Sequence, residues 1–144
     1  MATPNPKLSL GGIVRRLVHD GILTERIAGE AVQAAQREKQ SVVRYIIAQN
    51  LATGRQVAEA AQREFGLPLV DLDAVDSELM PTSAVDGKLL ERHHALPLFK
   101  RGKRLYVAVS DPTNMVAMDE FKFASGLSTE AILVEEDKLA RRIE

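Results

Sequence analysis

Apolar residues recur three and four positions apart through the first part of the chain, which is the spacing of one face of an α-helix. Ile13 and Leu17 follow this spacing, and so do the apolar residues between 27 and 35. Beyond residue 64 the pattern changes to short apolar runs separated by proline and glycine, which is typical of strands and turns. We therefore predict an all-helical subdomain at residues 1–64 and a mixed subdomain at residues 65–144.

Three runs in the second part have the composition of β-strands, at residues 96–99, 105–109 and 131–134. The first two flank a basic turn at residues 100–104, in which Gly102 can take a positive φ, so the pattern predicts a β-hairpin. We interpret the basic turn as a solvated hairpin tip, with phosphate or acidic-partner contact as the alternative. The expected fold class is α+β: a tandem helix-pair repeat followed by a small α/β subdomain with a three-stranded, largely antiparallel sheet.

The helical part contains an internal repeat. Val14 and Arg15 recur as Val43 and Arg44, and Thr24 recurs as Thr53 with the same offset. Two copies of one supersecondary unit are therefore predicted, each a pair of helices.

Each copy carries the signals that end one helix and begin the next. Gly21 and Asn50 are the residue types that most readily take the left-handed conformation after a helix. Thr24 and Thr53 then follow as the expected N-caps of the second helices. Ile22 and Leu51 lie in the turns, and we expect both to be buried between the helices.

Ser110, Asp111 and Pro112 follow a predicted strand and precede a helical stretch. Because serine and aspartate are good caps and proline suits the first helical turn, we predict that Ser110 or Asp111 caps this helix. The alternative is that Asp111 presents its carboxylate to a guanine edge or a partner amide. A short helix is also predicted at residues 85–93.

Composition narrows the classes of function. The chain has 19 Lys and Arg against 20 Asp and Glu, a net charge of -1, and only 4% aromatic residues. This balance provides neither the positive field nor the stacking platforms that nucleic-acid binding uses. Since there is no cysteine and no long apolar run, we expect a cytoplasmic protein that meets the membrane only indirectly, through partners.

Motifs that carry catalysis are absent from the sequence. It has neither a Gly-x-x-x-x-Gly-Lys-Ser/Thr loop for a triphosphate nor a Gly-x-Ser-x-Gly elbow for a nucleophile. The three histidines have no metal-ligand spacing, and the carboxylates at 135–137 are consecutive, which predicts a solvated acidic turn. We predict that this chain is not itself an enzyme and has no catalytic residue, metal site or resident cofactor.

Two stretches are more specific than composition. The string from 96 to 114, with its strand ending in Ser-Asp-Pro, and the stretch from 118 to 126 resemble the N-terminal domain of the GspE/PilB/MshE family of secretion and pilus motor ATPases. Residues 41–73 and 129–139 resemble, within that family, the type IV pilus extension ATPases. The resemblance implies a cytoplasmic hexameric motor whose C-terminal domains hydrolyse ATP, with this chain as its regulatory N-terminal part leading towards the motor.

The resemblance implies two modes of regulation. In MshE-type relatives a tandem motif, Arg-Leu-Gly-x-x-Leu-x-x-x-Gly followed by spaced Leu, Leu and Gln, binds cyclic di-GMP directly. Here Gly12 stands at the arginine of the first copy and Glu64 at the glutamine of the second, so the motif is degenerate. The residues that this alternative would use are Leu17, Gly21, Ile46 and Asp111.

The other mode is docking of a PilZ-type adaptor, which links the motor to a separate cyclic di-GMP receptor and to twitching motility. A repeat whose nucleotide motif has decayed can still present arginine, tyrosine and aliphatic side chains, which are typical of interface anchors. A structural alternative is packing of this module within the motor hexamer. The candidate docking residues are Val14, Arg15, Arg16, Val18, Arg44, Tyr45 and Ile47.

Overall fold

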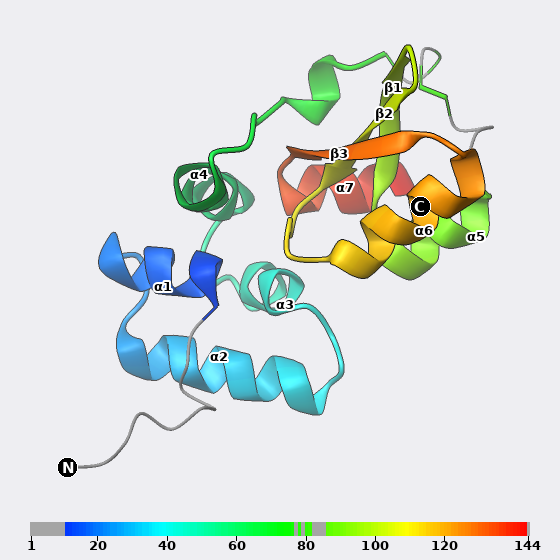
Figure 1. Ribbon diagram of the computed structural model, residues 1–144. Coiled ribbons are helices and arrows are strands. Elements are labelled where there is room, and N and C mark those ends of the chain that lie inside the picture. The colour runs from blue at the N-terminus through cyan, green and yellow to red at the C-terminus, as the bar shows by residue number, and fades with distance from the viewer. Residues whose placement is uncertain (1–10, 77, 79, 82–85, 144) are drawn as a thin grey trace. The chain divides into compact units, whose positions relative to one another are not determined.

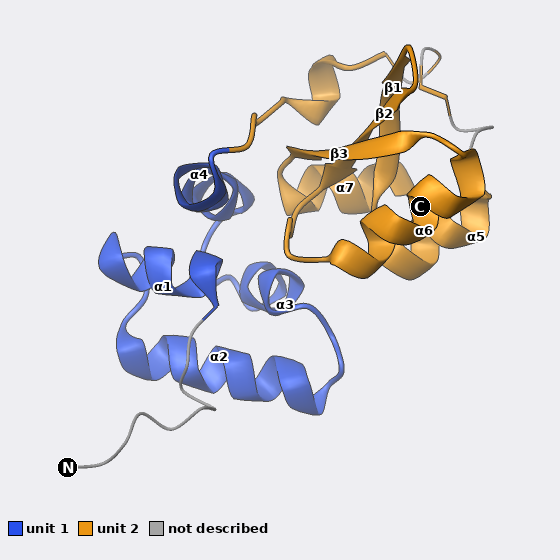
Figure 2. Ribbon diagram, viewed as in Figure 1, with its two compact units in different colours: residues 1–66 blue, residues 67–144 orange. Residues whose placement is uncertain are grey.

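The computed structural model describes residues 11–76, 78, 80–81 and 86–143. The chain divides into two compact units, residues 1–66 and residues 67–144 (Figure 2). The first unit ends at Gly66, which takes a left-handed conformation with φ 67° directly after a helix. Each unit has its own buried residues.

Four helices make up the described part of the first unit: α1 (Gly12–His19), α2 (Glu25–Arg37), α3 (Val42–Ala48) and α4 (Gly54–Phe65) (Figure 1). α1 packs mainly on α4, and α2 packs mainly on α3. In terms of the repeat, each helix therefore pairs with a helix from the other copy. Neither copy buries its apolar face alone, so the two copies form one interlocked core.

The first helix of each copy ends in the same way. Gly21 has φ 77° and Asn50 has φ 57°, both in the left-handed region. The N–H of the next residue donates to the carbonyl of Leu17 in the first copy and of Ile46 in the second, at 2.9 and 3.0 Å. This bond to the carbonyl five residues back is the Schellman closure, and its recurrence supports the duplication read from the sequence.

The turn residues Ile22 and Leu51 are half-buried, so the expectation that both are buried is wrong. The residue after each of them, Leu23 and Ala52, points into the core instead, with exposed fractions of 5% and 7%. The left-handed turn causes this shift, because it swings the chain outward for one residue before the next helix begins.

The second helices begin at threonine caps, as predicted. The Thr24 hydroxyl accepts a hydrogen bond from the N–H of Ile27 at 3.2 Å. The Thr53 hydroxyl accepts from the N–H of Gln56 at 3.1 Å, and the Gln56 side chain accepts from the N–H of Thr53 at 2.9 Å. The second copy therefore has a full capping box, whereas the first has only the threonine bond.

The second unit contains a three-stranded sheet in the order β1 (Leu96–Arg101), β2 (Arg104–Val109), β3 (Ser128–Leu133). β1 and β2 form the predicted antiparallel hairpin around Gly102, whose φ is 61°. β3 pairs with β2 in parallel because α6 (Met115–Ser125) returns the chain to the same end of the sheet. The α+β fold class is confirmed, but the sheet is mixed, with one antiparallel and one parallel pairing, rather than largely antiparallel.

Short helices cover the sheet. α6 packs on β3, and α5 (Gly87–His93) packs on α6. Residue 85, where α5 was expected to begin, lies outside the described residues. α7 (Glu136–Ile143) packs on β2 and on the short 3-10 helix η2 (Leu72–Ala74). Leu72, Leu96, Leu98, Ala108, Ile132, Val134 and Leu139 form a buried apolar cluster with Met80. None of the helices in the described ranges is long and apolar enough to cross a membrane.

The cap of α6 differs from the expectation. Asn114, rather than Ser110 or Asp111, accepts the hydrogen bond from the N–H of Ala117, at 3.2 Å. Asp111 instead accepts from the backbone N–H and the hydroxyl of Thr113, so residues after the strand form a turn before the helix begins.

Candidate functional site

The candidate docking residues fall on the first helix of each copy, α1 and α3. On α1, Arg15 is exposed and Val18 is half-buried. The equivalent residues on α3, Arg44 and Ile47, have the same exposures. The repeat thus presents an arginine and a branched aliphatic residue twice, with the same exposures.

Arg16 and Tyr45 are also equivalent positions, but they differ in their surroundings. Arg16 is half-buried, and its Nε lies 3.4 Å from the Glu64 carboxylate at the end of α4. That contact lacks hydrogen-bond geometry, so Arg16 Nε is a buried donor without a hydrogen-bond partner in the described structure. Tyr45 is half-buried on α3.

Val14 does not belong to an exposed surface. It is 1% exposed, and its equivalent in the second copy, Val43, is 0% exposed. Both point inward because they lie on the same face of their helices as Leu17 and Ile46, which are fully buried. Val14 is therefore a core residue. The other candidate docking residues are exposed or half-buried: Arg15, Arg16, Val18, Arg44, Tyr45 and Ile47.

The residues proposed for direct nucleotide binding come from both units and differ in their exposure. Leu17 and Ile46 have exposed fractions of 0%, and Gly21 forms the turn after α1. Asp111 belongs to the other unit, where its Oδ1 accepts hydrogen bonds from the N–H and the hydroxyl of Thr113. Asp111 is half-buried, and Gly21 is exposed but has no side chain.

The start of α1 and the end of α4 meet at Gly12. A Cβ placed on Gly12 would lie 3.1 Å from Cγ of Glu64 and 3.2 Å from Cζ of Phe65. An arginine at position 12, as in the nucleotide motif, would have to displace these side chains. The Glu64 carboxylate also faces this point, and it would repel a phosphate group.

A second ion pair joins α1 to α4. Arg63 Nη2 donates to Asp20 Oδ2 at 2.8 Å, and Nδ1 of His19 lies 3.3 Å from Asp20 Oδ1. Desolvation acts to raise the pKa of Asp20, but the hydrogen bonds with His19 and Arg63, together with the nearby guanidinium charges, outweigh it and hold that pKa below its ordinary value of 3.8. The two copies are thus joined by charge as well as by apolar packing.

The sequence did not reveal a buried polar network in the second unit. The expected solvated turn at 135–137 is wrong for Glu136, which is 5% exposed. The Ser110 hydroxyl donates to Glu136 Oε1 at 2.6 Å, and His94 Nε2 lies 2.8 and 2.7 Å from the two carboxylate oxygens. Because the carboxylate lies between the serine and the histidine, the histidine cannot activate the hydroxyl, and the network holds α7 against the sheet rather than forming a nucleophile.

His93 extends this polar arrangement on the other side of α5. Its Nε2 lies 2.7 Å from Glu120 Oε2 on α6, while the adjacent His94 reaches α7. His94 has a positive φ of 52°, and the two rings contact different helices. The spacing of apolar residues in the sequence does not predict this left-handed turn. Across the described ranges, no three His, Asp or Glu residues come together as a metal site would require.

Comparisons with known proteins agree on a family and a fold. The chain is 40% identical to the type IV pilus assembly ATPase PilB of Pseudomonas aeruginosa over 97% of its length, and 41% identical to that of Acinetobacter baylyi over 96%. It spans about a quarter of the length of these curated relatives, 25% and 24%.

Two solved structures share the fold at low sequence identity. The structure of MshE with cdg aligns with a TM-score of 0.68 at 22% identity, covering 91% of this chain and 95% of the other. The N-terminal domain of XpsE aligns with a TM-score of 0.72 at 23% identity, covering 92% of this chain and 91% of the other. Residues 65–144 match the MshEN domain. The chain therefore belongs to the MshEN domain family, as the resemblance of its sequence to the pilus and secretion motor ATPases had indicated.

Proposed function

We propose that this chain is the N-terminal regulatory domain of a type IV pilus assembly ATPase, and that its helical unit docks a PilZ-type adaptor. Identity of 40% and 41% to PilB relatives along nearly the whole chain supports the parent protein. ATP hydrolysis belongs to regions of the parent outside this chain. The domain acts in the cytoplasm, reaches the inner membrane only through partners, and couples the motor to cyclic di-GMP signalling and twitching motility.

The observation that carries the docking proposal is the repeated surface on α1 and α3. Each copy offers an exposed arginine, Arg15 or Arg44, and a half-buried aliphatic residue, Val18 or Ile47. A guanidinium beside apolar surface binds carboxylates and aromatic faces of a partner, and such residues carry much of the energy of protein interfaces. Arg15 has no ion-pair partner within the described residues, so its charge is available to another protein.

Direct binding of cyclic di-GMP is the second candidate, because the MshE structure of the same fold was solved with cdg. The local geometry weighs against it. Gly12 provides no guanidinium to stack on guanine or to pair with phosphate, and Glu64 places a negative charge beside that position. Leu17 and Ile46 remain as core residues, as a helix pair needs them whether or not a nucleotide binds.

A matched pair of double variants tests the docking surface. Arg15→Ala with Arg44→Ala removes both arginines from the first helices. The control, Arg26→Ala with Arg55→Ala, removes the equivalent two arginines from the second helices, where their side chains are 76% and 72% exposed. Both variants lose the same net charge, so a difference between them reports position on the surface.

Binding of a purified PilZ-type adaptor to each variant is measured by calorimetry. We expect the first-helix variant to bind at least about tenfold more weakly, as loss of two interface arginines typically costs more than about 1.4 kcal/mol. The control variant should bind as the unchanged chain does. Equal affinities for all three proteins would refute the proposed surface, and circular dichroism establishes that each variant is folded.

The structural alternative, in which the domain only packs within a motor hexamer, makes a different prediction. It requires the isolated chain to associate with itself as concentration rises, without an adaptor. Sedimentation equilibrium of the chain alone distinguishes the two: a docking module stays monomeric, whereas a packing module gains mass with concentration.

A further inference from the structure

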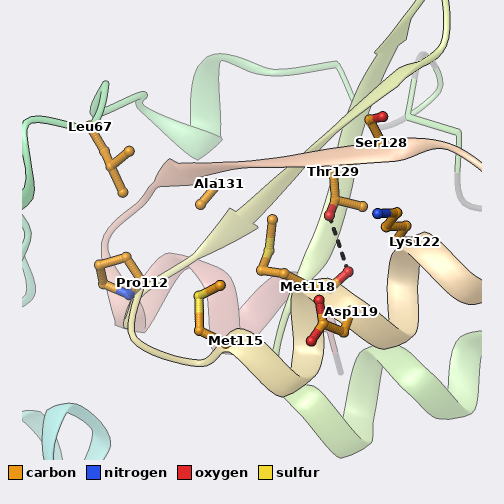
Figure 3. Close-up of a pocket in the computed structure, with 9 residues that line it drawn as sticks. All are labelled: Leu67, Pro112, Met115, Met118, Asp119, Lys122, Ser128, Thr129 and Ala131. Carbon is orange, nitrogen blue, oxygen red and sulfur yellow. Dashed lines mark hydrogen bonds between the residues drawn. The ribbon is translucent and has the colours of Figure 1, made fainter.

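A groove of about 400 Å³ lies between α6 and β3 in the second unit (Figure 3). Met115 and Met118 line it from α6, and Thr129 and Ala131 line it from β3. Leu67 lies at the end of the groove where the unit begins. The two methionines give this wall adaptable side chains that can fit several apolar partners.

The backbone of β3 is paired on one side only along this groove. The N–H of Ser128 donates to the carbonyl of Lys103 at 2.9 Å, and the N–H of Val134 donates to the carbonyl of Val109 at 3.1 Å. Even-numbered residues of β3 therefore bond to β2. By the alternation of a strand, the N–H and C=O groups of the odd-numbered residues point away from β2, towards the outer edge.

The chain itself uses one of these outward positions. The N–H of Leu133 donates to the carbonyl of Pro68, and the N–H of Val70 donates to the carbonyl of Leu133, each at 2.9 Å. This short segment runs parallel to β3 and ends the pairing there. Thr129 and Ala131 have the same outward orientation, yet no strand lies beside them in the part of the chain that the structure describes.

Large apolar side chains are exposed to solvent beside the groove. Met115 is 62% exposed, and Phe123, in an adjoining hollow on α6, is 93% exposed. Asp119 and Lys122 also line the groove, and neither has an ion-pair partner within the described residues. Their charges balance, so the groove favours an occupant for its apolar side chains rather than for its charge.

We propose that an extended segment of a separate partner protein, apolar at alternate positions and without net charge, adds to β3 as a fourth strand. Its backbone would pair with the outward groups of Thr129 and Ala131, in line with the segment that already pairs with Leu133. Its apolar side chains would lie against Met115 and Met118 of α6. Strand addition of this kind takes affinity from backbone bonds and specificity from alternate side chains. The site uses residues of the second unit only, so it stands or falls independently of adaptor docking.

The probe is a phage-displayed library of random linear peptides, screened against the whole chain. We expect enriched sequences with apolar residues at alternate positions, whose synthetic versions bind with an affinity that changes less than about twofold with salt. N-methylation of single peptide amides then tests the backbone pairing. Methyl groups at every second amide should weaken binding at least about tenfold, and those at the intervening amides should leave it unchanged.

Two variants and a control locate the binding. Ala131→Pro removes an outward N–H that β2 does not use, so the sheet should fold while peptide affinity falls at least about tenfold. Met115→Asp places a charge on the groove wall at an already exposed position and should have the same effect. Val116→Ala, at an exposed residue of α6 that does not line the groove, should leave affinity unchanged.

Three results would overturn the proposal. They are the absence of any enriched sequence, N-methyl effects without a period of two, and binding that survives both groove variants. A fourth result would overturn the choice of a separate partner protein. If the isolated chain binds the peptides but the full-length parent protein does not, a segment of the parent itself occupies the groove. These experiments measure peptide binding to the second unit, so a failure of the proposed adaptor docking would not change their interpretation.

Discussion

The interlocked arrangement of the four helices makes a prediction about how the first unit unfolds. Leu17 on α1 and Ile46 on α3 are equivalent residues of the repeat, and each has an exposed fraction of 0%. Because α1 packs on α4 and α3 packs on α2, a cavity at either residue weakens contacts made by both copies. Leu17→Ala and Ile46→Ala should therefore destabilise the whole unit, not one half of it.

The size of the effect follows from full burial. Replacing a buried leucine or isoleucine by alanine typically costs about 2–5 kcal/mol, from lost apolar transfer and from the cavity. For a unit of roughly 66 residues, each kcal/mol lowers the melting temperature by about 4–8 °C, so about 3 kcal/mol corresponds to a loss of about 12–24 °C. Arg26→Ala is the control: its side chain is 76% exposed and its pair with Glu30 is worth only about 0.3–0.5 kcal/mol.

Hydrogen exchange followed by mass spectrometry resolves the two copies. For each core variant, amides in α1, α2, α3 and α4 should lose protection by the same free energy, since one cooperative core supports all four. Faster exchange confined to the copy that carries the substitution would show that each helix pair folds independently, and it would refute the interlocked core. The control variant should exchange as the unchanged chain does.

Three further predictions concern single polar groups. The pKa of Asp20 is lowered in the folded state, so the pairing of its carboxylate stabilises the fold at pH values above the ordinary pKa of 3.8. This stabilisation is lost as the pH falls through the lowered pKa. Arg63→Ala should raise the pKa of Asp20 again, as measured by an NMR titration of its carboxyl carbon. Glu136→Ala should cost about 3 kcal/mol in chemical denaturation because it leaves the buried Ser110 and the half-buried His94 without their shared partner. A cost below about 1 kcal/mol would contradict the buried network. Thr53→Ala should lower the free energy of unfolding by about 1 kcal/mol, and Thr24→Ala should lower it by less, because only Thr53 takes part in a capping box. Equal losses for the two variants in thermal melts would contradict a stabilising role for the capping box.

Local signals in the sequence were sufficient for much of the fold. The equivalence of Thr24 and Thr53, and the turn residues Gly21 and Asn50, predicted the repeat and its helix boundaries because capping and left-handed turns depend on residues close in sequence. Gly102 identified the hairpin for the same reason.

The features that sequence reasoning missed depend on residues distant in the chain. The parallel pairing of β3 depends on how α6 carries the chain across the sheet, which periodicity does not encode. Glu136 was expected to be solvated because its neighbours are acidic, but its partners His94 and Ser110 come from other elements. Val14 was placed on the docking surface because helical spacing alone does not say which face meets another helix.

The most direct test of the account is a pair of calorimetric titrations of this chain, one with a purified PilZ-type adaptor and one with cyclic di-GMP. Adaptor docking through the helical repeat predicts saturable one-to-one binding of the adaptor in the micromolar range or tighter, and no heat from the nucleotide at the same concentrations. Heat from the nucleotide, with none from the adaptor, would contradict that claim and would restore the repeat as a nucleotide site.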